Sequence, residues 1–314
     1  MAKLYWMIGI SGSGKSTMAE KIAKEENAYI IASDKIRKEL YGDQNIQGNP
    51  QEVFNTIYIK IFDYLRIGKN VVFDATNISL KKRQILFKFL KKHYITPKNI
   101  AVVMTTPINI CHAQNNSRGR VVPQNVIEKQ YRHFNIPFFE EGFDEIILDG
   151  WFDNKPITKE DINTYNKFNY KNLLSILDIM FPFDQKNPHH QFTLGKHCIE
   201  VYKRLKEYSD DKSLLSAALI HDIGKLKTQT FSQKGIAHYC QHANVGCYEL
   251  LQNLDIFSLS PFEIIRVLAY VNYHMFPFDW KSEKTKEKYN KIFGNEIFNN
   301  LILLNKIDKD CSVN

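Results

Sequence analysis

The stretch GISGSGKSTM has the residue spacing of a loop that holds phosphate groups. Its pattern, Gly-x4-Gly-Lys-Ser, lies between an apolar stretch and a helical one, which is the context of a Walker A loop. Glycines let backbone N–H groups turn toward phosphate oxygens, Lys15 can neutralise β- and γ-phosphates, and the Ser16 hydroxyl can ligate Mg²⁺. The pattern predicts nucleotide binding by Gly9, Ser11, Gly12, Ser13, Gly14, Lys15, Ser16 and Thr17.

A carboxylate and an arginine follow the second apolar stretch, AYIIAS. In SDKIR, Asp34 is expected at the carboxyl end of a strand, the edge at which open α/β sheets bind ligands. A carboxylate there can accept the proton of an attacking hydroxyl. Arg37 would lie on the same helix face and could hold a phosphate of the acceptor. Two plainer interpretations stay open, because Asp34 could cap the following helix and Arg37 could be solvated.

Two further stretches carry charged residues whose roles the sequence leaves open. VVFDATN ends near Asp74, which could act in the second shell of the magnesium ion, orient Arg37, or cap a helix that begins after Ser79. NNSRGRVVP carries Arg118 and Arg120 between two expected helices. An arginine that closes over the β- and γ-phosphates would stabilise transition-state charge, whereas the alternative is a solvated loop.

The stretch HDIGK begins with a His-Asp pair suited to binding metals. Neutral imidazoles and carboxylates without thiolates suit Mn²⁺, Fe²⁺, Co²⁺, Ni²⁺ or Zn²⁺, and adjacent His and Asp can serve two metals because the carboxylate can bridge. Two metals would clamp a phosphate and activate a water for phosphoester hydrolysis. Taken singly, each residue is more often structural, but they recur in order over five helical segments. These candidates are His197, His221, Asp222, His242, His274 and Asp308.

Different elements must position the two groups of residues. The first half alternates β-branched runs with amphipathic stretches, which predicts a parallel sheet with helices on both faces. The second half shows helical periodicity and predicts an all-α domain. We therefore expect an α/β domain at 1–150, a linker at 151–166 and an all-α domain at 167–314. The expected strands are KLYWMIG, AYIIAS, NVVFDAT, NIAVVMTT and DEIILDG.

Composition agrees with two folded domains. The chain has 314 residues, of which 44% are hydrophobic and 24% charged. Five cysteines without a CxxC pair argue against a disulfide framework and for a reducing compartment, so we expect a cytoplasmic protein without membrane contact. Residues 1–150 hold 21 Lys and Arg against 15 Asp and Glu, so any contact with a polyanion is expected mainly in the first half.

The motifs of the first half resemble, in order and spacing, the 5′-hydroxyl polynucleotide kinase domain of phage end-healing enzymes. GISGSGKS, SDKIR, DATN and SRGRVVP carry the resemblance over about residues 3 to 150. It implies ATP with Mg²⁺ as cofactors and a P-loop kinase fold. It also implies that the reaction is carried by Lys15, Ser16, Asp34, Arg37 and Arg118, the last preferred over Arg120 because it directly precedes the glycine.

The order H…HD…H…H…D resembles the HD-domain phosphohydrolases, and HDIGK resembles the HD module of bacterial tRNA nucleotidyltransferases. The resemblance spans about residues 185 to 310 and implies a catalytic Asp222 and a Lys225 that contacts the phosphate. The implied ligands of the first metal are His197, His221, Asp222 and Asp308. His242 and His274 would complete a second metal site.

Three functions are compatible with this combination. The leading hypothesis is a bifunctional enzyme that phosphorylates 5′-hydroxyl ends of RNA or DNA and removes a 3′-phosphate or 2′,3′-cyclic phosphate, leaving ends for a separate ligase. The phage enzymes use a DxDGT phosphatase, a string absent here, and the HD half would take its role. The alternatives are a nucleoside or nucleotide kinase fused to a 5′-nucleotidase-like HD module, and an NTP-dependent switch with a nucleotide-sensing HD module.

Overall fold

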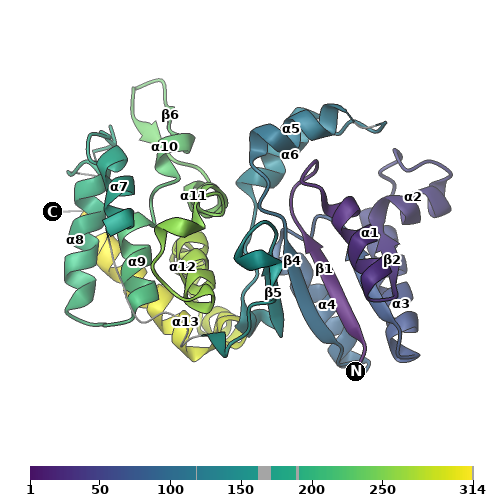
Figure 1. Cartoon of the computed structure of the whole chain (residues 1–314). Helices are drawn as coiled ribbons and strands as arrows, with labels where there is room; N and C mark the ends of the chain where they lie inside the picture. The colour runs from purple at the N-terminus through teal and green to yellow at the C-terminus, as the bar shows by residue number, and fades with distance from the viewer. Residues whose placement is uncertain (118, 162–170, 189–190, 313–314) are drawn as a thin grey trace. The chain divides into compact units, whose positions relative to one another are not determined.

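The computed structural model describes residues 1–117, 119–161, 171–188 and 191–312. The chain divides into two compact units, Met1–Thr158 and Lys159–Asn314 (Figure 1). The division falls inside the expected linker at 151–166, of which 162–166 lie outside the described residues. Residues just after Gly150 join the first unit because the buried Ile157 forms an antiparallel bridge with Ile146.

The first unit is built on a five-stranded parallel sheet with the order β2-β3-β1-β4-β5, as the sequence predicts. Central strand β1 is buried along most of its length, which explains its unbroken apolar sequence. Parallel strands place their carboxyl ends at one edge, where the loops of the candidate site begin. The strands are β1 (Lys3–Ile8), β2 (Ala28–Ala32), β3 (Asn70–Asp74), β4 (Lys98–Val103) and β5 (Glu145–Leu148).

Helices cover both faces of this sheet (Figure 1). Tyr5 and Met7 share a core cluster with Ala19 of α1, whereas Trp6, which points to the opposite face, stacks on Phe87 of α4 with ring centroids 4.7 Å apart. The alternation of side chains along β1 thus builds two cores, one on each face. The helices are α1 (Lys15–Glu25), α2 (Ser33–Tyr41), α3 (Pro50–Arg66), α4 (Leu80–Lys92), α5 (Ile108–Asn116) and α6 (Gln124–Arg132), with the short η1 (Phe139–Glu141) and η2 (Phe152–Asn154).

The second unit is helical, as predicted, apart from a short hairpin of β6 (Thr230–Phe231) and β7 (Ala237–His238). Two-residue strands are too short to show alternation in the sequence. The helices are α7 (Lys171–Met180), α8 (Leu194–Lys206), α9 (Lys212–Ile220), α10 (Lys225–Thr228), α11 (His242–Leu250), α12 (Pro261–Tyr273) and α13 (Glu283–Ser312), with η4 (Leu254–Ile256) and η5 (Phe276–Asp279).

Local signals in the sequence explain where several of these helices begin. Helix α12 starts with Pro261 behind a capping box, in which Ser260 and Glu263 satisfy each other's backbone N–H groups. Helix α13 breaks at Gly294, whose φ of 70° lies outside the helical region. No helix in the described part of the chain has both the length and the apolar character that a membrane span requires.

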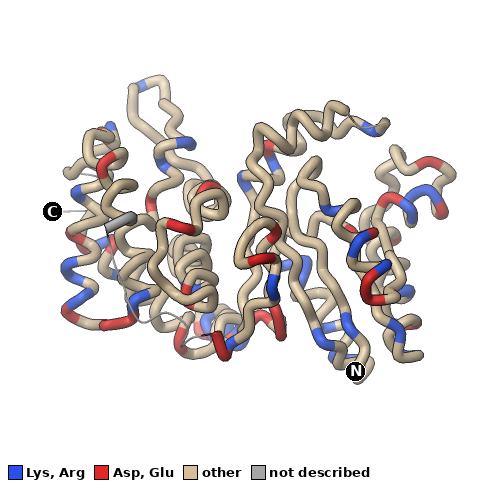
Figure 2. The backbone as a smooth tube through the Cα atoms, in the orientation of Figure 1, with Lys and Arg blue, Asp and Glu red and all other residues tan. Residues whose placement is uncertain are grey.

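Basic and acidic residues occur in both units, as Figure 2 shows. Helix α4 is an exception to this mixture, because its sequence LKKRQILFKFLKK carries six Lys and Arg and no Asp or Glu. The positive excess of residues 1–150, 21 minus 15 or six, is equal to the charge of this one helix.

Candidate functional site

The phosphate loop connects β1 to α1 and needs its glycines for conformation and for space. Gly12 and Gly14 have φ values of 83° and 88°, which L side chains rarely adopt. A Cβ atom on Gly12 would also lie 2.1 Å from the carbonyl oxygen of Cys111. The backbone of Cys111 therefore holds the loop in a shape that only glycine at position 12 permits.

Lys15 and Ser16 lie at the start of α1 with their polar atoms inside the loop. The Lys15 ammonium is buried and donates to the carbonyl oxygen of Ile10 at 2.7 Å. The Ser16 hydroxyl donates to a carboxylate oxygen of Asp74 at 2.8 Å, which links the loop to the end of β3. A hydroxyl beside a carboxylate is an oxygen donor set of the kind that Mg²⁺ prefers. Of the three roles left open for Asp74, this contact favours the magnesium shell.

Asp34 lies in the first turn of α2, and its two carboxylate oxygens contact two arginines. Arg37 donates to one oxygen at 2.8 Å, and Arg120 lies 2.6 Å from the other. The helix cap is Ala32 and makes no side-chain cap hydrogen bond, so the interpretation of Asp34 as a cap is wrong. Arg37 is mostly buried, so its interpretation as a solvated residue is also wrong.

A cavity of about 590 Å³ brings these residues together. Its lining includes Lys15, Ser16, Asp34, Arg37, Asp74 and Arg120. Each carboxylate oxygen of Asp34 has one arginine contact and a second lone pair, so the carboxylate can also accept from a hydroxyl in this cavity. Arg118, predicted to close over the phosphates, lies outside the described residues.

Residues distant in sequence support the phosphate loop, and no local pattern pointed to them. The side-chain oxygen of Gln130, on α6, accepts from the backbone N–H of Ser11 at 2.7 Å, and the hydroxyl of Thr106 donates to the carbonyl of Ser13 at 3.0 Å. Only the packing of α6 and the end of β4 against the loop reveals these contacts.

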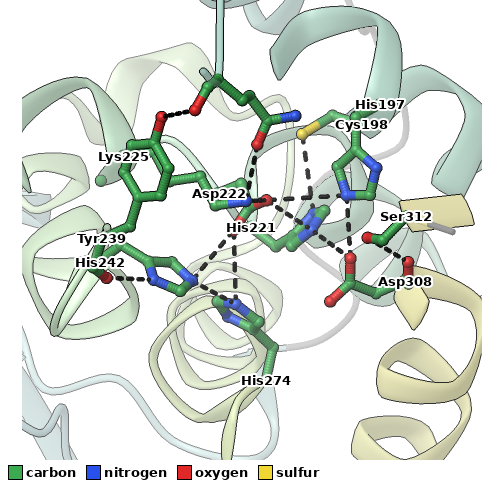
Figure 3. A network of polar contacts seen from close by, with 12 residues as sticks. His197, Cys198, His221, Asp222, Lys225, Tyr239, His242, His274, Asp308 and Ser312 are labelled. Atoms are coloured by element: carbon green, nitrogen blue, oxygen red, sulfur yellow. Dashed lines mark hydrogen bonds and ion pairs between the residues drawn. The ribbon is translucent and has the colours of Figure 1, made fainter. Parts of the chain in front are cut away.

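The metal-binding candidates of the second unit converge from five helical segments (Figure 3). Helix α8 supplies His197, the end of α9 supplies His221 and Asp222, and α11, α12 and α13 supply the other three. Five of the six residues are buried. They form two groups with Asp222 in common: His197, His221, Asp222 and Asp308, and Asp222, His242 and His274.

Asp222 divides its two carboxylate oxygens between the groups. One oxygen lies 3.7 Å from Nε2 of His197 and 3.5 Å from Nε2 of His221. The other lies 3.1 Å from Nε2 of His242 and 3.7 Å from Nε2 of His274. This division is the arrangement expected of a carboxylate that bridges two cations.

Backbone carbonyls orient three of the imidazoles. Nδ1 of His221, His242 and His274 lies 2.7–2.9 Å from a carbonyl oxygen in each case. A carbonyl accepts only from N–H, so Nδ1 carries a proton in each ring, and Nε2, which faces the centre of the cluster, is the atom left to bind a ligand. Nε2 of His221 is buried without a hydrogen-bond partner among the described residues. Buried Nε2 atoms that converge in this way fit divalent cations.

Charge in the cluster is arranged for cation binding. Burial lowers the pKa of His274 to about 3, with His242 and His221 adding to the shift, so this imidazole is neutral at physiological pH. Burial disfavours the ionised form of Asp222, but Lys225 and His221 hold the pKa of its carboxyl well below the usual range. Asp222 is therefore ionised and His274 neutral, as a metal requires of these two ligands. Burial disfavours the charged form of His221, but Asp222 and Cys198 raise the pKa of this imidazole well above its ordinary value, so a metal must displace a proton from it.

Lys225 is fixed by residues that sequence reasoning missed. Its ammonium lies 2.7 Å from a carboxylate oxygen of Asp222 and donates to the side-chain oxygen of Gln185 at 2.9 Å. Gln185 is 1% exposed, and its backbone carbonyl accepts from the hydroxyl of Tyr239 at 2.6 Å. A single glutamine before α8 carries no sequence signal of this role.

Family models match both units. The model of the AAA domain matches residues 4–137, and that of the HD domain matches residues 194–310. The chain therefore joins a P-loop kinase-like domain to an HD domain. This confirms the architecture that the sequence motifs predicted.

Solved structures similar to the chain include a chain of the Pnkp1/Rnl/Hen1 RNA repair complex, at 24% identity over 54% of this chain and 52% of that chain, with a TM-score of 0.37. Another is the APS kinase CysC of Mycobacterium tuberculosis in complex with AMPPNP and APS, at 20% identity over 37% of this chain and 69% of that chain, with a TM-score of 0.32. The chain thus spans about half the length of the repair protein.

Proposed function

We propose that the chain is a bifunctional enzyme that heals nucleic-acid ends, with a 5′-hydroxyl kinase in the first unit and a 3′-end phosphohydrolase in the second. The observation that carries the proposal is the pairing, in one chain, of two opposite phosphate chemistries. A carboxylate beside a phosphate loop suits transfer of a phosphate to a hydroxyl, and a bridged His-Asp cluster suits its removal.

In the kinase reaction, the 5′ oxygen attacks the γ-phosphorus of the nucleoside triphosphate, and the bond from that phosphorus to the β-phosphate oxygen breaks. Asp34 accepts the hydroxyl proton and the nucleoside diphosphate leaves. Lys15 balances charge on the phosphates, and Arg37 holds the phosphate on the 3′ side of the terminal nucleotide. Mg²⁺ held near Ser16 and Asp74 would neutralise charge on the β- and γ-phosphates.

In the hydrolytic reaction, water breaks a phosphorus–oxygen bond at a 3′-phosphate or 2′,3′-cyclic phosphate. Divalent cations bound by the six ligands would neutralise the phosphate and lower the pKa of the attacking water. Lys225 would donate to a phosphate oxygen, since it is fixed at the edge of the cluster by Asp222 and Gln185. The healed ends would then be substrates for a separate ligase.

An assay of oligonucleotide ends tests both halves of the proposal. Lys15→Ala should abolish phosphate transfer to a 5′-hydroxyl end and leave 3′-phosphate removal intact, whereas Asp222→Ala should do the reverse, each by at least about a thousandfold. Lys24→Ala and Asp210→Ala, at exposed positions in the same units, are matched controls.

The choice of acceptor separates this proposal from a kinase of small molecules. Polynucleotide binding should weaken as salt rises, because phosphate contacts release counterions. Transfer to a free nucleoside but not to an oligonucleotide, with no dependence on salt, would rule out the proposed acceptor.

A further inference from the structure

A second cavity, of about 530 Å³, adjoins the phosphate loop. It shares Gly12 and Gly14 with the cavity that contains Asp34, but its other lining residues differ. They include Thr17, Met18, Lys21, Thr106, Gln114 and Asp149. The volume lies in the range of small-ligand sites, and the lining combines an apolar thioether with polar groups that can orient a ligand.

Asp149 is the residue of this cavity whose chemistry the proposed reactions leave unused. Its backbone is fixed directly after β5, because its N–H donates to the carbonyl of Val103 at 2.9 Å and its carbonyl accepts from the hydroxyl of Thr105 at 2.6 Å. The half-buried carboxylate makes no hydrogen bond and no ion pair with any described residue. Burial raises its pKa, and the charge of Lys21 only partly opposes the shift.

A half-buried carboxylate keeps part of its hydration, so a ligand that fills the cavity must replace that water with donors of its own. The first cavity holds Asp34 and its two arginines and is committed to the acceptor. A nucleotide whose phosphates lie on the loop can therefore place its nucleoside in the second cavity, which Asp34 does not line. The group that meets Asp149 must offer N–H or O–H donors, which excludes the phosphates and leaves the base and the ribose hydroxyls. Of these, the base is the part that can place two donors side by side against both oxygens of the carboxylate and that differs between nucleotides.

We propose that the second cavity binds the base of the phosphate donor and that Asp149 selects guanine over adenine. This inference rests on the proposed nucleotide site of the first unit. Guanine presents its N1–H and 2-amino donors side by side, which matches the two oxygens of one carboxylate. Adenine presents one amino donor beside the N1 lone pair, which repels the second oxygen. The Gln114 amide, in the same cavity, can donate to guanine O6.

Titration of the full chain with nucleoside diphosphates tests this selection. The wild type should bind GDP about tenfold more tightly than ADP, because one bidentate pair discriminates between bases by about this factor. Asp149→Ala should bring the two affinities close together. Equal affinities in the wild type, or tighter binding of ADP, would overturn the proposal.

A second variant gives a result that a purely structural role of Asp149 cannot produce. Asp149→Asn should lose affinity for GDP and gain it for xanthosine diphosphate, since xanthine has a carbonyl oxygen where guanine has its 2-amino group, and an asparagine amide can donate to it. Asp153→Asn, at an exposed position nearby, is the matched control and should leave all affinities unchanged. An Asp149→Asn chain that keeps the wild-type order of affinities contradicts the assignment.

The acceptor assay distinguishes this inference from the proposed function. If no nucleotide supports transfer to a 5′-hydroxyl oligonucleotide, the acceptor proposal fails while the base selection can still be measured by binding. If GTP and ATP support transfer with equal kcat/KM and bind equally, the base selection fails and the end-healing proposal stands.

Discussion

The two candidate sites are built in opposite ways. The phosphate loop of the first unit is a continuous run of eight residues, Gly9–Ser16, whose backbone amides and glycine conformations create the site. The metal cluster of the second unit is made of six side chains drawn from residues 197 to 308, all directed at one point. A loop of this kind is specified locally, whereas the cluster exists only when five helical segments pack together.

This difference predicts that divalent cations affect the stability of the two units differently. The phosphate loop places its charged group against its own backbone, because the Lys15 ammonium donates to the carbonyl of Ile10 at 2.7 Å. The cluster instead places Nε2 of His242 and of His274 only 3.1 Å apart, with both atoms facing inward beside the Asp222 carboxylate. A divalent cation can bind to these atoms together, so cations should stabilise the second unit in a way that the first unit does not share.

The largest expected effect comes from a buried ion pair of the first unit, whose two residues lie far apart in the sequence. Arg83 is 1% exposed and makes two hydrogen bonds to Glu141, at 2.7 and 2.8 Å. Arg83→Met leaves this carboxylate buried and unpaired, so the first unit should lose about 3–5 kcal/mol of unfolding free energy, measured in denaturant. Lys81→Met, exposed on the same helix, is the control and should cost little.

The stability of the Arg83→Met chain should depend on pH because of Glu141. Burial raises its pKa, and removing Arg83 removes the charge that opposes the rise. A carboxyl whose folded pKa exceeds the unfolded value stabilises the fold at low pH and loses that contribution as pH rises. The destabilisation should therefore be larger at pH 8 than at pH 5. A stability loss that is independent of pH would show that Glu141 is not the source.

The next largest effect is stabilisation of the second unit by a divalent cation. Mn²⁺ at about a hundred times its dissociation constant should contribute about 2.7 kcal/mol, which corresponds to roughly 5–10 °C in the melting temperature of a domain of this size. Asp222→Asn should remove most of this shift, because Asp222 belongs to both ligand groups. His238→Asn, at an exposed position outside the cluster, should keep it. An equal shift in all three chains would contradict a metal site.

The sequence predicts the parts of each site that have local patterns and misses the parts that depend on contacts between distant residues. The strands, the phosphate loop and the order of the histidines have local signals, and the structure brings His197, His221, His242 and His274 together as the pattern led us to expect. The sequence did not reveal Gln130 or Gln185, because a hydrogen bond between residues distant in the chain leaves no periodicity to detect.

Charge at the sheet edge was also only partly predictable. The sequence pattern identified Asp34 and Arg37 as a pair on one helix face, and they are in contact. It left the role of Arg120 open, because the approach of the 119–123 segment to α2 depends on tertiary packing rather than on local residues.

The smallest predicted effect tests whether the metal cluster depends on supporting residues as the loop depends on Gln130. Gln185→Leu removes the side-chain acceptor that holds the Lys225 ammonium, so Lys225 would keep its ion pair with Asp222 and its contact with the Tyr239 ring. Hydrolysis of a 3′-phosphate should fall about tenfold, a loss of about 1.4 kcal/mol. Because Gln185 acts through Lys225, kcat should fall more than KM changes, and transfer to 5′ ends should be unaffected.

Two comparisons separate this positioning role from simple destabilisation. Gln185→Glu keeps an oxygen for Lys225 and should retain most of the hydrolysis, whereas Gln233→Leu, exposed in the β6–β7 turn, should behave as the wild type. If Gln185→Glu loses as much activity as Gln185→Leu while Mn²⁺ still stabilises both chains, then Lys225 does not need this acceptor. In that case the six ligands and Lys225 would suffice for hydrolysis. The contact of Gln185 with Lys225 would then support the fold but not the reaction.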